Sequence, residues 1–257
     1  MTKGSVKQLF CKITGARYAI ALTGAGISTL SGIRDFRGEN GLYREGLEAG
    51  AGGVLAEKMF DIRCFEEDPS FFYKAAGSLV YTTDEKEPSL VHTVLAELER
   101  RGFLKAVITQ NIDLLHQRGG SRRVIEIHGS PQQHYCLRCG GIRMGFAEAA
   151  ALVKAGELPR CPRCGGVLKP AITFFGESLP LEARREAEAE AQEADLMLVL
   201  GTSLRVFPAA DLPRTTLRRG GELVIVNNMA TPLDGQAVLR FDDLEEVFRE
   251  LEHLLRS

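Results

Sequence analysis

The stretch Tyr18–Gly38, YAIALTGAGISTLSGIRDFRG, decides the fold of this chain. It begins with a short apolar run of strand length and continues directly into Thr23-Gly24-Ala25-Gly26. Two glycines this close after a buried strand let the main chain turn sharply and approach a ligand without a Cβ in the way. Ser28 and Thr29 can cap a following helix, whose N-terminal amides would face a pyrophosphate. The stretch therefore predicts the first unit of a dinucleotide-binding fold.

The glycine fingerprint of this unit is incomplete, because Thr29 stands where G-x-G-x-x-G has its third glycine. Instead of a second strand with an acidic residue at its end, the segment GIRDFRG follows almost at once. A glycine turn alone does not need Asp35, Phe36 and Arg37. These departures argue against a dehydrogenase that transfers hydride.

Composition sets the class of protein. The 257 residues can bury a core as one large domain or as one domain with an insert. The net charge of -2 gives no nucleic-acid footprint, and no apolar run reaches membrane-spanning length. The N-terminus lacks the apolar core of a signal peptide. We expect a cytoplasmic monomer that needs neither a membrane nor a specific nucleic acid.

Four later apolar segments repeat the pattern of a strand that ends in glycine or small polar residues: Phe103–Ile108, Val124–Ile127, Leu196–Leu200 and Leu223–Val226. Such near-continuous apolar strands are typical of a parallel sheet buried on both faces. Ligands bind outside the carboxyl ends of such strands, so the five strand ends should line one crevice. The segment Ala237–Phe241 is a candidate sixth strand.

Helical spacing of apolar residues predicts four helices, at Val6–Gly15, Pro69–Tyr81, Ser89–Arg101 and Leu244–Leu255. Between them, Glu39–Asp68 is rich in glycine and is predicted to be a long irregular loop. A loop of this length in a compact domain is usually functional, often a lid.

Four of the six cysteines form two matched pairs, Cys136-Leu-Arg-Cys139 and Cys161-Pro-Arg-Cys164, and each pair is followed by two glycines. Four thiolates complete a tetrahedral Zn²⁺ site and leave no position for water or substrate, so we expect one structural ion. A redox dithiol and a nucleic-acid-binding ribbon are the alternatives. We expect the single residues Cys11 and Cys64 to be packing residues.

Together, these motifs resemble the sirtuins, the NAD-dependent protein-lysine deacylases. The motifs occur in the family's order: GAGIS (24–28), GIRDFRG (32–38), TQNID (109–113), HG (128–129), the paired CxxC, FFGE (174–177), GTS (201–203) and VN (226–227). One departure is Arg34, where the family often has proline. The resemblance implies an α/β fold with a Rossmann-like parallel sheet and an inserted small domain. The Rossmann-like domain would comprise residues 1–40, 82–130 and 170–257. The small domain would combine a helical insert with a cofactor loop, 41–81, and a zinc module, 131–169.

The resemblance also implies the reaction. The acetyl amide oxygen would attack C1′ of the nicotinamide ribose, and nicotinamide would leave. A general base would then activate a ribose hydroxyl. The products would be free lysine, nicotinamide and 2′-O-acetyl-ADP-ribose. His128 would be the base, since an imidazole with a pKa near neutrality suits this step, and Asn111 would be the second catalytic residue.

The same resemblance assigns the binding residues. NAD would contact Gly24, Ala25, Gly26, Thr29, Asp35, Phe36, Arg37, Gln110, Asn111, Ile112, Asp113, His128, Gly201, Thr202, Ser203 and Asn227. An acetylated protein or peptide would contact Ile172, Phe174, Gly176, Glu177, Val206 and Phe207. Main-chain pairing with the peptide would read few side chains and would explain a loose sequence preference.

Two alternatives to deacylation stay open at this stage. The same NAD site could transfer ADP-ribose to a protein. The chain could instead be a non-enzymatic zinc-ribbon module, but this interpretation would leave the strand-end motifs unexplained.

The identity of the acyl group is a separate question, because family members that prefer succinyl-lysine carry Tyr-x-x-Arg on one helix. Here Tyr73 stands at the tyrosine position and Ala76 at the arginine position, so we expect a preference for neutral acetyl-lysine.

Overall fold

A six-stranded parallel sheet forms the centre of the larger part of the molecule. The computed structural model describes residues 5–35, 41 and 57–256. The strand order is β3-β2-β1-β7-β8-β9, and every neighbouring pair is parallel. The strands are β1 (Ala19–Thr23), β2 (Leu104–Thr109), β3 (Val124–Glu126), β7 (Leu196–Leu200), β8 (Glu222–Val226) and β9 (Leu239–Phe241). All five predicted strands are confirmed, and the candidate sixth strand is β9.

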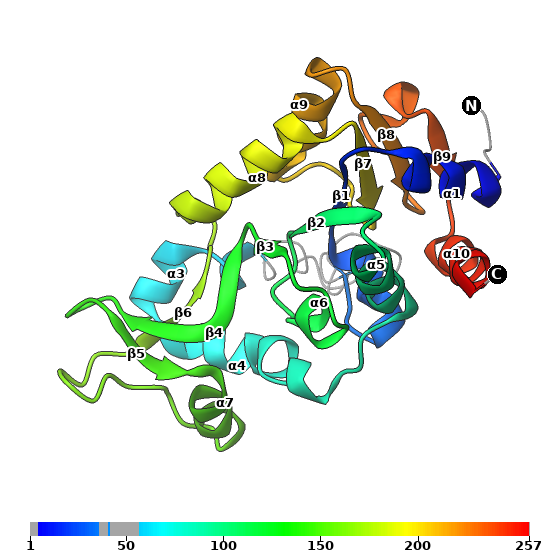
Figure 1. Ribbon diagram of the computed structural model, residues 1–257. Coiled ribbons are helices and arrows are strands. Elements are labelled where there is room, and N and C mark those ends of the chain that lie inside the picture. Colours follow the sequence, from blue (N-terminus) through cyan, green and yellow to red (C-terminus); the bar gives the residue numbers. More distant parts are fainter. Residues whose placement is uncertain (1–4, 36–40, 42–56, 257) are drawn as a thin grey trace.

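Helices cover both faces of this sheet (Figure 1). One face packs on α1 (Val6–Gly15), α5 (Leu90–Arg100) and α10 (Leu244–Arg256). The other face packs on α8 (Leu181–Glu193) and α9 (Leu212–Arg218). Alternate residues of β1 enter the two cores, since Ala21 belongs to the first core and Leu22 to the second. This arrangement explains why the strands are apolar throughout.

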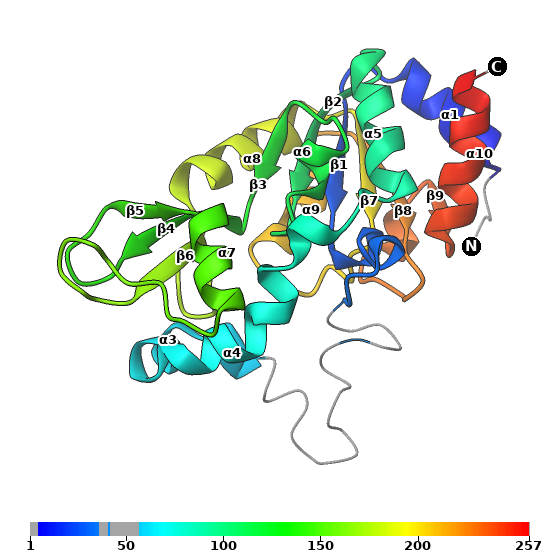
Figure 2. The ribbon, with the colours of Figure 1, turned by 90° about the horizontal axis from the view of Figure 1, so that it is seen from below.

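A smaller antiparallel sheet lies at the other end of the molecule (Figure 2). Its order is β5-β4-β6, with β4 (Gly129–Cys136), β5 (Ile142–Gly145) and β6 (Leu168–Ile172). The helices α3 (Ile62–Glu67), α4 (Pro69–Val80) and α7 (Phe146–Lys154) enclose a third core with it. Phe60, Phe65, Phe72 and Phe174 meet there in edge-on and tilted pairs.

The remaining described elements are short. They include α6 (Leu115–Arg118) and the 3₁₀ turns at Thr83–Glu85, Ala209–Asp211 and Asp234–Gln236. Within the described residues, no helix is long and apolar enough to cross a membrane.

The prediction of a helix directly after β1 is wrong. Residues 24–35 contain two 3₁₀ turns, Ala25–Ile27 and Thr29–Ser31. The side chains that would have capped a helix have other partners: the Ser28 hydroxyl donates to Asp113, and the Thr29 hydroxyl donates to the Gly26 carbonyl oxygen. Tertiary contacts therefore replace the local cap.

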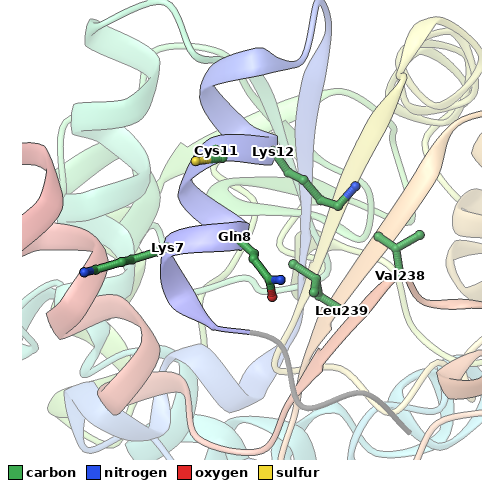
Figure 3. A pocket seen from close by; sticks show the side chains of 6 residues that line it. All are labelled: Lys7, Gln8, Cys11, Lys12, Val238 and Leu239. Carbon is green, nitrogen blue, oxygen red and sulfur yellow. The ribbon is translucent and has the colours of Figure 1, made fainter.

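Two smaller predictions also need correction. The irregular stretch predicted over Glu39–Asp68 ends in a helix, α3, which Asp61 caps with its side chain; residues 36–40 and 42–56 lie outside the described part of the chain. Cys11 is exposed, not packed. Figure 3 shows it on α1, among the side chains that line a pocket together with Val238 and Leu239. Cys11 lies two residues past the buried Leu9 of α1, and two residues rotate a side chain by about 200° around a helix.

Candidate active site and cysteine cluster

A cleft of about 720 Å³ lies at the carboxyl ends of the central strands. It brings together most of the residues expected at the NAD and peptide sites, from loops far apart in the sequence. Those that line it are Gly24, Ala25, Gly26, Asp35, Gln110, Asn111, Ile112, Asp113, His128, Ile172, Phe174, Gly176, Glu177, Gly201, Thr202, Ser203, Val206 and Phe207. The strand ends thus form one crevice, as the sequence predicts.

Of the described residues expected to bind NAD, Thr29 and Asn227 are not among those that line the cleft. Phe36 and Arg37 lie outside the described residues. Thr29 is exposed and bonds to the Gly26 carbonyl oxygen. Asn227 is buried, and its side-chain amide donates to the Met229 carbonyl oxygen at 2.8 Å. Met229 itself lines the cleft, so Asn227 supports this wall in the present geometry.

The glycines of the first turn permit two main chains to touch. The Gly26 N–H donates to the Gly201 carbonyl oxygen at 2.9 Å. A Cβ on Gly26 would come within 2.8 Å of the Gly201 Cα, and Gly201 itself has φ of +61°. Neither position tolerates a larger residue without displacing backbone. The close approach places the loops after β1 and β7 side by side in the cleft wall.

Asn111, Asp113 and Ser28 form a buried polar cluster behind the glycine turn. The Ser28 hydroxyl donates to the Asp113 carboxylate at 2.6 Å, and the Leu115 N–H donates to its other oxygen at 3.0 Å. The Asn111 side-chain amide donates to the Gly24 carbonyl oxygen and to Ser28. Burial raises the pKa of Asp113. Sequence reasoning assigned Ser28 to a helix cap and missed this role, although Ser28 belongs to the GAGIS motif.

His128 follows β3 and is held at both its side chain and its main chain. Its Nδ1 atom lies 2.9 Å from the Gln110 carbonyl oxygen, which can only accept, so Nδ1 carries the proton and Nε2 is the basic nitrogen. Its own carbonyl oxygen accepts the Thr173 N–H at 2.7 Å. Burial lowers the pKa of His128 below the ordinary value of 6.5. The imidazole is therefore neutral at pH 7 and able to accept a proton.

The segment after β6 offers main-chain groups to the cleft. Phe175 is bound on one side, because its N–H donates to the Phe60 carbonyl oxygen and its carbonyl oxygen accepts the Ile62 N–H. In the described part of the chain, no hydrogen bond engages the N–H or carbonyl oxygen of Gly176. Gly176 follows in a turn, with φ of +93°, which the hydrogen bond from the Glu177 N–H to the Phe174 carbonyl oxygen closes at 3.0 Å. The main-chain groups of Gly176 are therefore available to a bound peptide.

Lys169, which sequence reasoning missed, lies directly beneath this segment. Its side chain is fully buried, and its ammonium group contacts Glu177 at 2.8 Å and the Ile172 carbonyl oxygen at 2.7 Å. It also lies 3.9 Å from the centre of the Phe174 ring. Glu177 accepts the Phe174 N–H as well. Burial lowers the pKa of Lys169, while its bonds to Glu177 act in the opposite direction. The one available signal was a lysine inside a short, otherwise apolar strand.

Tyr73, the tyrosine that the sequence assigns to the acyl pocket, uses its hydroxyl for another hydrogen bond. Tyr73 is buried in the third core, and its hydroxyl donates to the Leu168 carbonyl oxygen at 2.5 Å. Tyr73 is not among the residues that line the cleft. This arrangement agrees with a site that does not bind an acyl carboxylate.

The four paired cysteines converge as predicted. Their sulfur atoms all lie within 4.8 Å of one another, with Cys136 and Cys164 at 3.5 Å and Cys139 and Cys161 at 3.6 Å. These separations exclude S–S bonds of about 2 Å. They suit a tetrahedral ion, whose Zn–S bonds of about 2.3 Å place sulfurs slightly under 4 Å apart. The cluster therefore fits one Zn²⁺.

Comparison with known sequences finds one family whose profile matches most of this chain. The profile of the Sir2 family matches residues 24–208. The NAD-dependent protein deacetylase of Thermotoga maritima is 42% identical, over 96% of this chain and 96% of its own length. The NAD-dependent protein deacetylase 1 of Pyrobaculum aerophilum is 45% identical, over 84% of this chain and 80% of its own.

Solved structures are similar over nearly the whole chain. A Sir2 complex with deacetylated p53 peptide and 3′-O-acetyl ADP-ribose superimposes with a TM-score of 0.88 at 40% identity and covers 98% of both chains. A Sir2 complex with p53 peptide and NAD⁺ gives 0.86 at 41% identity, over 99% of this chain and 100% of that one. The parallel sheet, its strand-end cleft and the cysteine module define a dinucleotide-binding fold with a metal module. The chain belongs to the Sir2 family.

Proposed function

We propose that this chain is an NAD-dependent protein-lysine deacetylase. It transfers the acetyl group of acetyl-lysine to ADP-ribose and releases nicotinamide, 2′-O-acetyl-ADP-ribose and free lysine. One observation carries the proposal: a neutral, oriented His128 shares a cleft with the glycine turn at Gly24 and with the segment around Gly176. The two relatives named above carry the same activity in their names.

When bound, NAD supplies an electrophilic ribose carbon from which nicotinamide can leave. His128 accepts the proton of a ribose hydroxyl at Nε2, while Gln110 holds the opposite nitrogen. Asn111 uses its Nδ2 atom within the protein, so its Oδ1 atom is assigned to a ribose hydroxyl or an ordered water. Asp113 and the Ile112 main chain are assigned to the nicotinamide carboxamide, which needs an acceptor and a donor.

Acetylated peptide enters beside Gly176 on one side and beside Val206 and Phe207 on the other. The unengaged main-chain groups of Gly176 support main-chain pairing with the peptide there. Phe175, Leu181 and Phe207 are large apolar side chains that are exposed at this cleft. They offer contact area to substrate side chains on either side of the acetyl-lysine.

The cysteine cluster is assigned a structural Zn²⁺, because four thiolates leave no open position for substrate. We also propose that residues 41–81 and 131–169 act as a small domain, with the rest of the chain as the NAD-binding domain. None of the six cysteines forms a disulfide, which suits a reducing compartment and supports a cytoplasmic location. We retain a monomeric state as part of the proposal.

The test is incubation with an acetyl-lysine peptide, with and without NAD, read by mass spectrometry. Deacetylation predicts loss of the acetyl mass from the peptide and formation of acetylated ADP-ribose, both only with NAD. A peptide or protein that instead gains the mass of ADP-ribose would assign the cleft to ADP-ribosyl transfer. No change in either arm would refute the proposed reaction.

A further inference from the structure

Two buried histidines lie behind the cleft and take no part in the proposed reaction. His92 of α5 and His116 of α6 are almost fully inaccessible, and their ring centres are 4.7 Å apart at an interplanar angle of 64°. Burial lowers the pKa of both, that of His92 to about 4. Both rings are therefore neutral near pH 7, and each carries one N–H and one lone pair.

The proton of His92 can be assigned from its neighbours. The Ser89 main-chain N–H donates to Nδ1 of His92 at 3.1 Å, so this nitrogen is the acceptor. The Ser89 Oγ atom lies 2.8 Å from the same nitrogen and 3.0 Å from the Ile27 carbonyl oxygen, so its single proton is shared between these two acceptors. Nε2 of His92 must then carry the proton. Within the described residues, this buried N–H has no hydrogen-bond partner.

His116 has the complementary arrangement. Its Nε2 atom lies 2.9 Å from the Thr23 hydroxyl, which donates its single proton to the Thr109 hydroxyl. Nε2 of His116 must then be the donor, and Nδ1 carries a lone pair that lacks a partner within the described residues. The opposite tautomer would put two unpartnered N–H groups side by side, which would raise the cost of burial.

We propose that His92 and His116 are positioning residues for the NAD site, joined through one buried water that accepts from Nε2 of His92 and donates to Nδ1 of His116. The pairing completes a chain of hydrogen bonds from the N-terminus of α5 to the hydroxyls of Thr23 and Thr109. The inference rests on the proposed function, because it concerns the same cofactor site.

Both ends of this chain reach loops of the NAD side. Ser89 holds the Ile27 carbonyl oxygen in the first glycine turn, and the Thr109 hydroxyl accepts the Asn111 N–H at 3.1 Å. The helices are also in close contact, since a Cβ on Gly119 would come within 3.1 Å of the His92 Cβ. Loosening the pair should therefore weaken NAD binding and leave peptide binding unchanged.

The first experiment determines which ring nitrogen of each histidine carries the proton. Long-range ¹H–¹⁵N spectra of the full chain distinguish the two neutral tautomers and the charged ring. Variants His92→Gln and His116→Gln assign the two signals. We expect both rings to be neutral and protonated at Nε2 at pH 7. A charged ring, or a proton at Nδ1 of either ring, would overturn the proposal.

The second experiment compares His116→Gln with His116→Leu. Glutamine can still donate to Thr23 at the position of Nε2, whereas leucine fills space and donates nothing. We expect leucine to weaken NAD binding, measured by calorimetry, by about tenfold, the equivalent of about one hydrogen bond, and glutamine to restore most of it. The peptide KM should stay unchanged. Thr216→Ala is the stability control, because this buried hydroxyl bonds to Ala191 on the other face of the sheet.

The outcomes separate three cases. Equal NAD affinity in wild type and both variants would overturn the positioning role, as would equal loss in both variants. An effect in Thr216→Ala as large as in His116→Leu would reduce the role to general stability and overturn the inference. A wild-type chain that binds no NAD would instead refute the proposed function. If the leucine variant fails to fold, the tautomer spectra and the NAD affinity of the glutamine variant still test the proposal.

Discussion

Replacing Lys169 with methionine should destabilise the peptide side of the cleft. Methionine keeps the length of the stem but has no ammonium group. The fully buried ammonium of Lys169 bonds to Glu177 at 2.8 Å and to two carbonyl oxygens, those of Pro170 and Ile172. The substitution therefore leaves a carboxylate without its cation and removes one donor from each of two carbonyl oxygens.

The magnitude follows from what Glu177 retains. Removing one partner of a buried ion pair costs about 3–5 kcal/mol. The Glu177 side chain is 22% exposed and still accepts the Phe174 N–H at 2.8 Å and the Tyr135 hydroxyl at 3.2 Å. Both features place the cost near the lower limit, at about 3 kcal/mol. For a chain of this size each kcal/mol lowers Tm by about 2–4 °C, so we expect a fall of about 6–12 °C.

Thermal unfolding of a double-mutant cycle measures this coupling. Lys169→Met with Glu177→Gln should recover part of the loss, because the unpaired charge is removed, while Lys169→Arg should remain the mildest change. In kinetics, Lys169→Met should raise the KM for peptide and leave the KM for NAD unchanged. Additive effects in the cycle, or a Tm within 1 °C of wild type, would refute the reasoning.

Three further predictions concern the base, the metal and the acyl group. His128→Ala should keep the fold and NAD binding but lower turnover by about 10²–10⁴-fold. In the wild type, the acid limb of the kcat/KM profile should lie below pH 6.5, since burial lowers the pKa of His128. An acid limb above pH 6.5 would contradict the assignment of His128 as the base. Removing the metal, or changing Cys136 to Ala, should lower Tm and activity together, because binding of Zn²⁺ to four thiolates contributes about 10 kcal/mol or more to folding; lost activity at unchanged Tm would indicate a catalytic ion. Acetyl-lysine peptide should be strongly preferred over succinyl-lysine peptide in kcat/KM, since the sequence has Ala76 at the position of the arginine and the Tyr73 hydroxyl is already bonded to Leu168. Comparable rates would show that another cation reaches the pocket.

The sequence by itself determined the strands of the large sheet and the residues at their ends. Apolar runs such as Leu196–Leu200 are local signals, and burial on both faces keeps them free of polar residues. The spacing of the paired cysteines was likewise sufficient to predict that they converge. These features could be predicted because each depends on a short stretch of chain or on a fixed chemical requirement.

Only the tertiary structure decided which side chains become partners. Ser28 and Thr29 have the residue types of helix caps, yet Ser28 bonds to Asp113 and no α-helix forms in residues 24–35. The ion pair of Lys169 with Glu177 and the contact of His92 with His116 also have no local sequence signature. A partner of this kind is selected by where the fold brings two segments together, and burial then makes an unsatisfied polar group costly enough to enforce the pairing.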